Sequence, residues 1–426
     1  MKSSREIVKF AFPAIIENFL QMLVGLSDTF LVSHISLSAV AAVSLANNVI
    51  TVYQAIFIAL GTMVSSLFAR KIAEKNTDKV QQLANSAVKF TVLVSLMMGI
   101  LSVTLGRPIA YIIGARATVL NLATVYLALV GGMIILLGLM TTFGSFLRAR
   151  GNTKTPMWAS FMANILNLIF SATLIFVFHF GVVGAALGTI VARLIASIFL
   201  YKKLNTEHPT RHFFREKLDK ELINLTIPAT GERLSMRIGD LLVMALVISF
   251  GSRVFAGNAI GESITQFNYM PAFGMATVTV ILVAQEFAQE NINNIKQYIR
   301  RTYWLSSIMM LIIGLFLFAS SHWLNALFTT EKIATQSSDT VILFSLLATF
   351  FVTGTTTYTA AFQGIGNAKL PFYTTTIGMF AIRLILGSFL GIFLHLGLVG
   401  VWIAVVLDNL FRFIFLKIKF YQLTKK

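Results

Sequence analysis

Two carboxylates, Glu17 and Asp28, interrupt a long apolar stretch that runs from Phe12 to Val32. In an α-helix their separation is within about 20° of three full turns and about 16 Å along the axis. Both acids are therefore expected on one stripe of one helix, at different depths. The helix, roughly residues 6–33, is long enough to cross a bilayer. Because an ionisable side chain inside a membrane is costly, it indicates a functional site.

The composition indicates a polytopic membrane protein. Of the 426 residues, 56% are hydrophobic and only 12% are charged, against about a quarter charged in soluble domains. The chain has no cysteine, which excludes disulfides and thiol chemistry, and its six histidines are not spaced as metal ligands. No metal site and no cofactor is expected, apart from a transported coupling ion.

The apolar runs predict an all-α fold of about twelve transmembrane helices. A polar connection, 202–220, is expected to separate an N-terminal lobe, 1–201, from a C-terminal lobe, 221–426. The expected helices are 6–33, 38–69, 87–113, 118–148, 156–179, 182–201, 221–250, 254–288, 300–322, 336–363, 370–394 and 397–419.

The basic residues predict the orientation. If the N-terminus is inside, most of the 34 Lys and Arg residues fall in cytoplasmic segments and few in outer loops. Both termini are then cytoplasmic, and the protein is a multi-pass protein of the inner (plasma) membrane. The net charge of +17 is thereby explained by topology and contact with anionic lipid, and nucleic acid is not expected as a partner.

The chain repeats itself. Four segments recur in order at an offset of 215 or 216 residues: 13–17 at 228–232, 69–76 more loosely at 284–291, 151–156 at 366–371, and 179–184 at 395–400. This pattern indicates two homologous six-helix halves with the same orientation, a parallel repeat that some secondary transporters use. The alternative is a duplicated structural bundle with no transport role.

Together these motifs resemble the multidrug and toxic compound extrusion (MATE) family of antiporters, and most of all its DNA-damage-inducible branch. The most specific pieces are Pro13-x3-Glu17 with Ser27-Asp28-Thr29, the segments 37–42 and 181–186, and the two Gly-Asn-x-Lys-x-Pro turns. The resemblance covers essentially the whole chain. It implies two lobes around a central cleft that opens alternately to each side, and a monomer that exports amphipathic or cationic small molecules by cation-coupled antiport.

The resemblance also implies a cation site in the N-terminal lobe. Asp28, Asn167 and Thr189 match three of its members, whereas Ser171 stands where the family has a second aspartate. The missing acid favours H⁺ over Na⁺ as the coupling ion. The family's other site pairs a seventh-helix glutamate, which Glu232 matches, with a tenth-helix acid that is absent here.

Asp28 is the expected coupling residue, because a dry site favours the protonated carboxyl and water favours the charged form. The alternative is a structural ion pair with Arg193. Glu17 could bind a cationic substrate, gate the inner mouth, or belong to an interfacial ion pair.

Further substrate or gating candidates lie in both halves: Glu232, which is the repeat equivalent of Glu17, and Glu262 with its repeat equivalent Asn47. Asp240, three residues after Arg237, is expected to pair with it.

Other functions fit the sequence less well. A flippase for lipid-linked precursors is the alternative within the same fold superfamily. An enzyme is disfavoured, because the chain has neither His-Glu-x-x-His nor Gly-x-Ser-x-Gly. A receptor or scaffold is disfavoured by the lack of a sizeable soluble segment.

Overall fold

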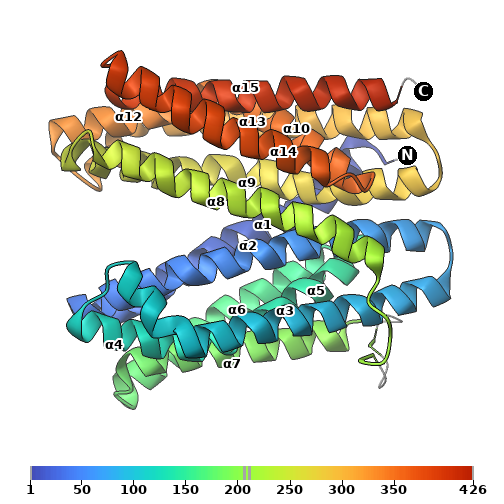
Figure 1. The fold of residues 1–426 in the computed structure, drawn as a ribbon, viewed down its shortest axis with the longest axis horizontal. Helices are drawn as coiled ribbons and strands as arrows, with labels where there is room; N and C mark the ends of the chain where they lie inside the picture. Colours follow the sequence, from blue (N-terminus) through green and yellow to red (C-terminus); the bar gives the residue numbers. More distant parts are fainter. Residues whose placement is uncertain (1, 205–207, 210–212, 425–426) are drawn as a thin grey trace. The chain divides into compact units, whose positions relative to one another are not determined.

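The computed structural model describes residues 2–204, 208–209 and 213–424, and its regular elements are all helices (Figure 1). The chain forms two compact units, one of residues 16–226 and one of residues 1–15 with 227–426. The limits of the units fall within helices α1 (Ser4–Ser33) and α8 (Lys220–Ile248). The division into lobes 1–201 and 221–426 stays a prediction.

The unit of residues 16–226 (blue to green in Figure 1) contains most of α1 and six further α-helices. Two π-helical turns, Leu127–Gly131 and Thr173–Val177, lie between its α-helices. The α-helices are α2 (Leu37–Ala73), α3 (Thr77–Ile112), α4 (Ala117–Tyr126), α5 (Ile135–Ala149), α6 (Lys154–Ala172) and α7 (Gly181–Lys202).

The second unit (dark blue at residues 1–15, then green to red in Figure 1) contains the start of α1, most of α8 and seven further α-helices. Its π-helical turns are Gly378–Leu386 and Phe389–Phe393. The α-helices are α9 (Ser252–Ala288), α10 (Ile292–Ala319), α11 (Ser321–Ala326), α12 (Lys332–Leu347), α13 (Thr349–Gly364), α14 (Lys369–Ile377) and α15 (Gly397–Leu423).

The predicted all-helical membrane fold is confirmed. Among the described residues, ten helical stretches are long and apolar enough to cross a bilayer, and the bent pair α12 and α13 makes an eleventh. Helix α8 has 29 residues and is long enough to cross a bilayer, but four charged side chains between 232 and 240 make it less apolar than the other spans. With α8 the number agrees with the predicted twelve.

Two helices begin earlier than predicted. Helix α3 begins at Thr77 and not at 87, and α10 begins at Ile292 and not at 300. Asn76 and Asn291, which are repeat equivalents, cap these helices by accepting hydrogen bonds from the backbone N–H groups of Lys79 and Asn294. A polar cap fixes the start of a helix, whereas hydropathy marks only the part inside the lipid.

The fourth helix of each half, which the sequence predicted as a single element at 118–148 and at 336–363, is interrupted. In the first half, a π-helical turn separates α4 from α5. In the second half, the chain bends by 56° between α12 and α13. The two interruptions occupy equivalent places in the repeat.

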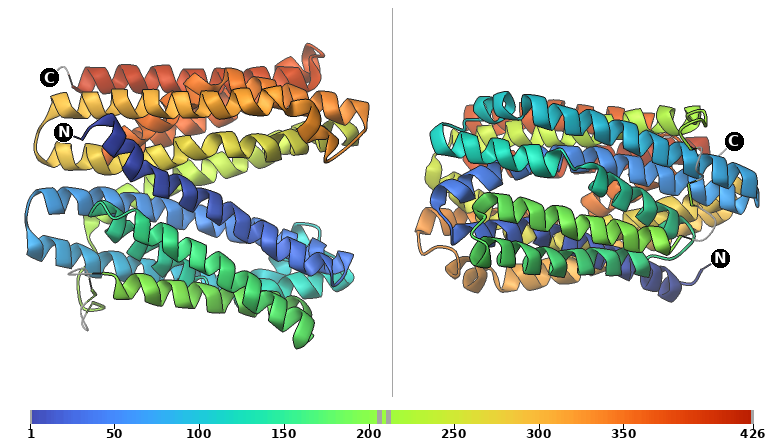
Figure 2. Two further views of the ribbon diagram at one scale, coloured as in Figure 1. Left: turned by 180° about the vertical axis from the view of Figure 1, so that it is seen from behind. Right: turned by 90° about the horizontal axis from the view of Figure 1, so that it is seen from below.

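Both chain termini lie at the same end of the second unit (Figures 1 and 2). The backbone N–H of Lys2 donates to the Tyr298 hydroxyl at 2.6 Å, and Arg301 donates to the carbonyl of Lys2 at 2.8 Å. At the other terminus, Lys296 donates to the carbonyl of Thr424 at 3.2 Å. Helix α10 thus holds both ends of the chain through its first three turns.

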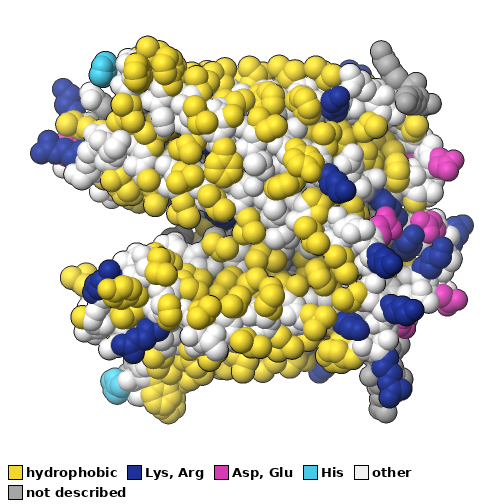
Figure 3. Space-filling model, in the orientation of Figure 1, with side chains coloured by type: hydrophobic (Ala, Val, Ile, Leu, Met, Phe, Trp, Pro, Cys, Tyr) yellow, Lys and Arg dark blue, Asp and Glu magenta, His cyan; other side chains and the backbone are white. Residues whose placement is uncertain are grey.

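The surface has the polarity of a membrane protein. On the face shown in Figure 3, hydrophobic side chains cover most of the helix sides, while Lys and Arg gather mainly toward the helix ends. Large apolar side chains such as Ile112 and Phe393 are among the most exposed. Exposed apolar area on this scale requires lipid around the helices.

Equivalent glycines allow two helix pairs to approach closely. A Cβ atom at Gly184 of α7 would lie 3.0 Å from the backbone carbonyl carbon of Leu174, and one at Gly400 of α15 would lie 2.7 Å from that of Leu390. Both contacts are made to π-helical segments or their edges. Small residues let membrane helices pack backbone to backbone.

We expect Gly400→Ala and Gly184→Ala to lower the thermal unfolding midpoint of the purified protein, by an equivalent of about 1–3 kcal/mol for overpacking. The effect should be larger for Gly400, where the added Cβ would come closer. Gly25→Ala is the control, because nothing lies within 4 Å of its Cβ position. Equal midpoints for all three variants and the wild type would contradict this packing.

Candidate functional site

Asp28 is buried within the unit of residues 16–226 and receives three hydrogen bonds from neutral groups. Its side chain belongs to α1 and is only 2% exposed. Its carboxylate accepts from the Tyr126 hydroxyl at 3.0 Å, from Nδ2 of Asn167 at 3.1 Å and from the Thr189 hydroxyl at 3.2 Å. Helices α1, α4, α6 and α7 therefore converge on one carboxylate.

The donors are themselves connected. Asn167 Nδ2 also lies 2.9 Å from the Thr189 hydroxyl and 3.4 Å from the Ser171 hydroxyl, and Ser171 donates to the carbonyl of Ala185 at 3.3 Å. The structure thus brings together the four residues predicted for the cation site, with Ser171 in contact with Asn167. The Asn167 side-chain oxygen is buried and has no hydrogen-bond partner among the described residues.

No basic side chain in the described part of the chain neutralises Asp28 directly. Among the described residues, no Lys, Arg or His side chain forms an ion pair with it, and Arg193 acts on it only at longer range. The direct ion pair between Asp28 and Arg193 that the sequence left open is therefore not formed. Hydrogen bonds alone hold the carboxylate, an arrangement that leaves it able to bind a proton or a cation.

The place of the missing second acid is tightly packed. A Cβ atom at Gly188 of α7 would overlap the Ser171 side chain of α6, so the two helices are nearly in backbone contact here. A longer aspartate at position 171 would have to push α7 away or turn elsewhere. The small serine and the glycine opposite it therefore fit one another.

Sequence reasoning missed Tyr126. It lies at the end of α4, directly before the π-helical turn Leu127–Gly131, and is fully buried. A buried tyrosine hydroxyl needs a polar partner, and Asp28 provides it. A buried tyrosine could therefore have been expected beside Asp28, but one sequence does not show which of the ten tyrosines is buried.

Glu17 forms an ion pair with Arg148. Nη1 of Arg148 lies 2.8 Å and 3.0 Å from the two carboxylate oxygens of Glu17, and Nη2 donates to the Ser145 hydroxyl at 3.1 Å. The side chains of Glu17 and Arg148 are 10% and 12% exposed. Of the roles considered for Glu17, the ion pair is the one seen in this structure.

The second half repeats this contact with a different partner. Glu232 of α8 accepts a hydrogen bond from Nε2 of Gln363 at 3.0 Å, and Gln363 is the repeat equivalent of Arg148. Both glutamates are buried. The acid is thus present in both halves, whereas its cationic partner is present only in the first.

The remaining candidates do not join these clusters. Asn47 of α2 is partly buried, and its backbone carbonyl accepts from the Thr51 hydroxyl. Glu262 of α9 is exposed and interacts with Asn258. No hydrogen bond in the described chain connects either residue to Asp28, Glu17 or Glu232.

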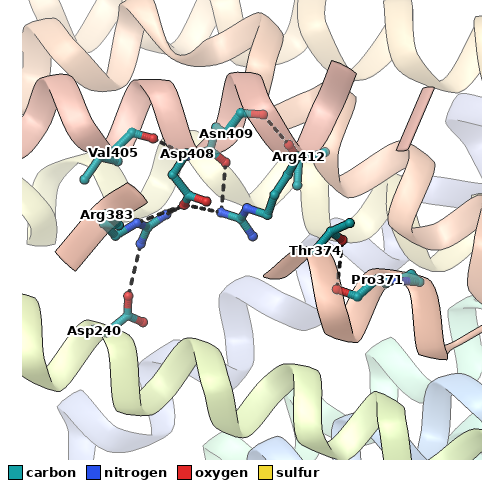
Figure 4. A network of polar contacts seen from close by, with 9 residues as sticks. Asp240, Pro371, Thr374, Arg383, Val405, Asp408, Asn409 and Arg412 are labelled. Atoms are coloured by element: carbon teal, nitrogen blue, oxygen red, sulfur yellow. Dashed lines mark hydrogen bonds and ion pairs between the residues drawn. The ribbon is translucent and has the colours of Figure 1, made fainter. Parts of the chain in front are cut away.

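A charged network occupies the second unit (Figure 4). One oxygen of the fully buried Asp408 accepts from Nη2 of Arg383 at 2.8 Å and from Nη2 of Arg412 at 2.7 Å. Arg383 also reaches Asp240 of α8 at 3.2 Å. The predicted pairing of Asp240 with Arg237 is therefore wrong, because Arg383, from a π-helical turn distant in sequence, takes its place.

Comparisons with known proteins agree with this architecture. The sequence model of the MatE family matches residues 13–173 and 228–389, two segments whose starts are separated like the internal repeat. The probable multidrug resistance protein NorM of Thermotoga maritima is 28% identical over 420 residues, which cover 96% of this chain and 90% of the relative. The multidrug export protein MepA of Staphylococcus aureus is 23% identical over 373 residues, covering 86% and 82%.

Solved structures show the same fold. An outward-facing multidrug resistance MATE family transporter superposes with a TM-score of 0.89 at 21% identity, covering 99% of this chain and 97% of that one. A MATE crystal structure in the bent conformation gives a TM-score of 0.88 at 21% identity, covering 99% and 96%.

We expect Arg148→Gln to destabilise the protein, because it leaves Glu17 buried without its cation. Breaking a buried ion pair from one side costs about 3–5 kcal/mol, which should lower the thermal unfolding midpoint clearly. The double variant Glu17→Gln with Arg148→Gln should recover much of the loss, since no charge is then stranded. A single variant as stable as the wild type would show that Glu17 is solvated or protonated instead.

Proposed function

Because this chain belongs to the MatE family, we propose that it is an antiporter that exports small organic molecules in exchange for a cation, with Asp28 as the coupling residue. The predicted resemblance to the MATE family is confirmed by the family match, and the named relatives are a probable multidrug resistance protein and a multidrug export protein. Export of drug-like molecules by a membrane transporter is the function these relatives support.

One observation carries the proposal: Asp28 is a buried carboxylate surrounded by neutral donors. A charged carboxylate in a dry site is unfavourable unless it is neutralised, so such a site tends to take up a proton or a cation. When water enters, the charged form becomes favourable again. A change of hydration at Asp28 would therefore couple ion binding to conformation.

The surrounding groups suit both protonation states. The charged carboxylate accepts from Tyr126, Asn167 and Thr189. A protonated carboxyl needs an acceptor, and the unpartnered oxygen of Asn167 supplies one if the amide group turns over. The proton is therefore the proposed coupling ion. Na⁺ is less favoured, because Ser171 replaces the second negative charge.

Coupling requires the two conformations to differ in ion affinity. A hundredfold difference in proton affinity would bias the conformational equilibrium by about 2.8 kcal/mol. Substrate that binds more tightly to the other conformation would bias the conformational equilibrium in the opposite direction. Alternating access then moves the proton inward and the substrate outward.

The proposed setting is the plasma membrane with both termini in the cytoplasm. Support comes from the placement of the two termini at one end of the same unit and from the basic residues expected in the inner segments. We propose a monomer as the working unit, without a cofactor.

The test is efflux of the cationic dye rhodamine 123 from liposomes that contain the purified protein, driven by an imposed pH or Na⁺ gradient. We expect efflux with the pH gradient and at least a tenfold loss in Asp28→Asn. Tyr126→Phe, which removes one of three donors, should cause a smaller loss and shift the pH dependence. Asp78→Asn, at an exposed carboxylate at the start of α3, is the control. Undiminished efflux in Asp28→Asn would refute the assignment.

A further inference from the structure

Helix α8 carries two arginines, Arg233 and Arg237, near its middle. In the described chain neither makes a hydrogen bond or an ion pair. At about 1.5 Å per residue, both Cα atoms lie within about 5 Å of the midpoint of the helix along its axis. In a hydrocarbon core about 30 Å thick, the nearer boundary is then about 10 Å away, which is farther than an arginine side chain reaches.

The opposite face of α8 packs on the neighbouring helix. A Cβ atom at Gly231 would lie 2.8 Å from the ring of Phe372, and the Ser235 hydroxyl is 3.0 Å from that of Thr376. Arg233 and Arg237 are each two residues from Ser235, which places them about 160° around the helix from it. Both arginines therefore point away from α14.

A third face of α8 is apolar and exposed. Ile227 and Ile238 are 63% and 50% exposed. They are about three turns apart and point in nearly the same direction from the helix axis, so this face suits lipid. An arginine in hydrocarbon is costly, and intramembrane arginines face water or a partner. Arg237 is exposed and Arg233 is partly exposed. With lipid on the apolar face and α14 on the packing face, we therefore expect the arginine face to border water.

The nearby carboxylates have other partners. Glu232 accepts from Gln363, and Asp240 is paired with Arg383. They act on Arg233 and Arg237 only at longer range. The guanidinium donors are thus available to an anion that arrives through the water. Their spacing of one helical turn allows both to contact one carboxylate.

We propose that Arg233 and Arg237 bind the carboxylate group of transported molecules, so that the exporter accepts amphipathic compounds with a carboxylate in addition to cations. This inference rests on the proposed function, but the site itself can be tested without transport. A lipid phosphate is the other anion with the same chemistry, and the experiment separates the two.

The first measurement uses the natural absence of cysteine. Thr230→Cys places a thiol beside the arginines. Ile238→Cys places a matched thiol on the apolar face, about 6 Å from the helix midpoint on its other side, as far as Thr230 lies on the first. Each is treated in liposomes with anionic sulfonatoethyl and cationic trimethylammonioethyl methanethiosulfonate. We expect Thr230→Cys to react and Ile238→Cys to stay unreactive. Arg233→Gln with Arg237→Gln should lower the anionic-to-cationic rate ratio at Thr230→Cys at least tenfold, while the double lysine variant should keep it.

The second measurement compares rhodamine 110, which has a free carboxylate, with rhodamine 123, its methyl ester. The double glutamine variant should lose at least tenfold in rhodamine 110 efflux and less than twofold in rhodamine 123 efflux. Failure to move either dye would contradict the proposed export, while the labelling ratio would still decide the site. An unreactive Thr230→Cys, an unchanged ratio, or efflux of rhodamine 123 alone by the wild type would overturn the inference. The inference would also be overturned if the changes in labelling ratio and rhodamine 110 efflux occurred only in phosphatidylglycerol vesicles and not in phosphatidylcholine vesicles.

Discussion

The structure depends on the inability of a membrane interior to solvate charge. Every buried ionisable group must find a partner within the protein, and the chain meets this demand in different ways. Glu17 is neutralised by Arg148, and Asp408 by Arg383 and Arg412. Asp28 receives only neutral hydrogen bonds. The first groups are fixed by their countercharges, whereas Asp28 is not, which is why we propose it as the coupling residue.

The internal duplication makes these differences visible. The repeat equivalents of Asp28 and Asn167 are Val243 and Ile382, so the second half has no counterpart of the cluster around Asp28 among its described residues. The second half instead has the network around Asp408, which balances its charges internally. The common acid of the repeat, Glu17 or Glu232, changes its partner from arginine to glutamine. The two halves of the repeat thus differ in how their buried charges are partnered.

Much of this could be predicted from the sequence, because membrane helices and a duplication leave long-range patterns. The helices are an example, whereas the association of Asp28 with Asn167, Thr189 and Ser171 was implied by the resemblance to the family. Tyr126 and the pairing of Asp240 with Arg383 could not, since they depend on tertiary packing between segments far apart in sequence. The early start of α3 was missed because a capping residue, Asn76, and not hydropathy sets it.

The first residues of the chain belong to the unit that is completed last. Residues 1–15 fold with 227–426, and Lys2 is held by Tyr298 and Arg301. At about 5–20 residues per second, a ribosome reaches Arg301 some 15–60 s after it has made Lys2. The amino-terminal tip must therefore wait unpaired during translation. A product truncated before α10 would lack both partners of Lys2, so that tip would stay undocked.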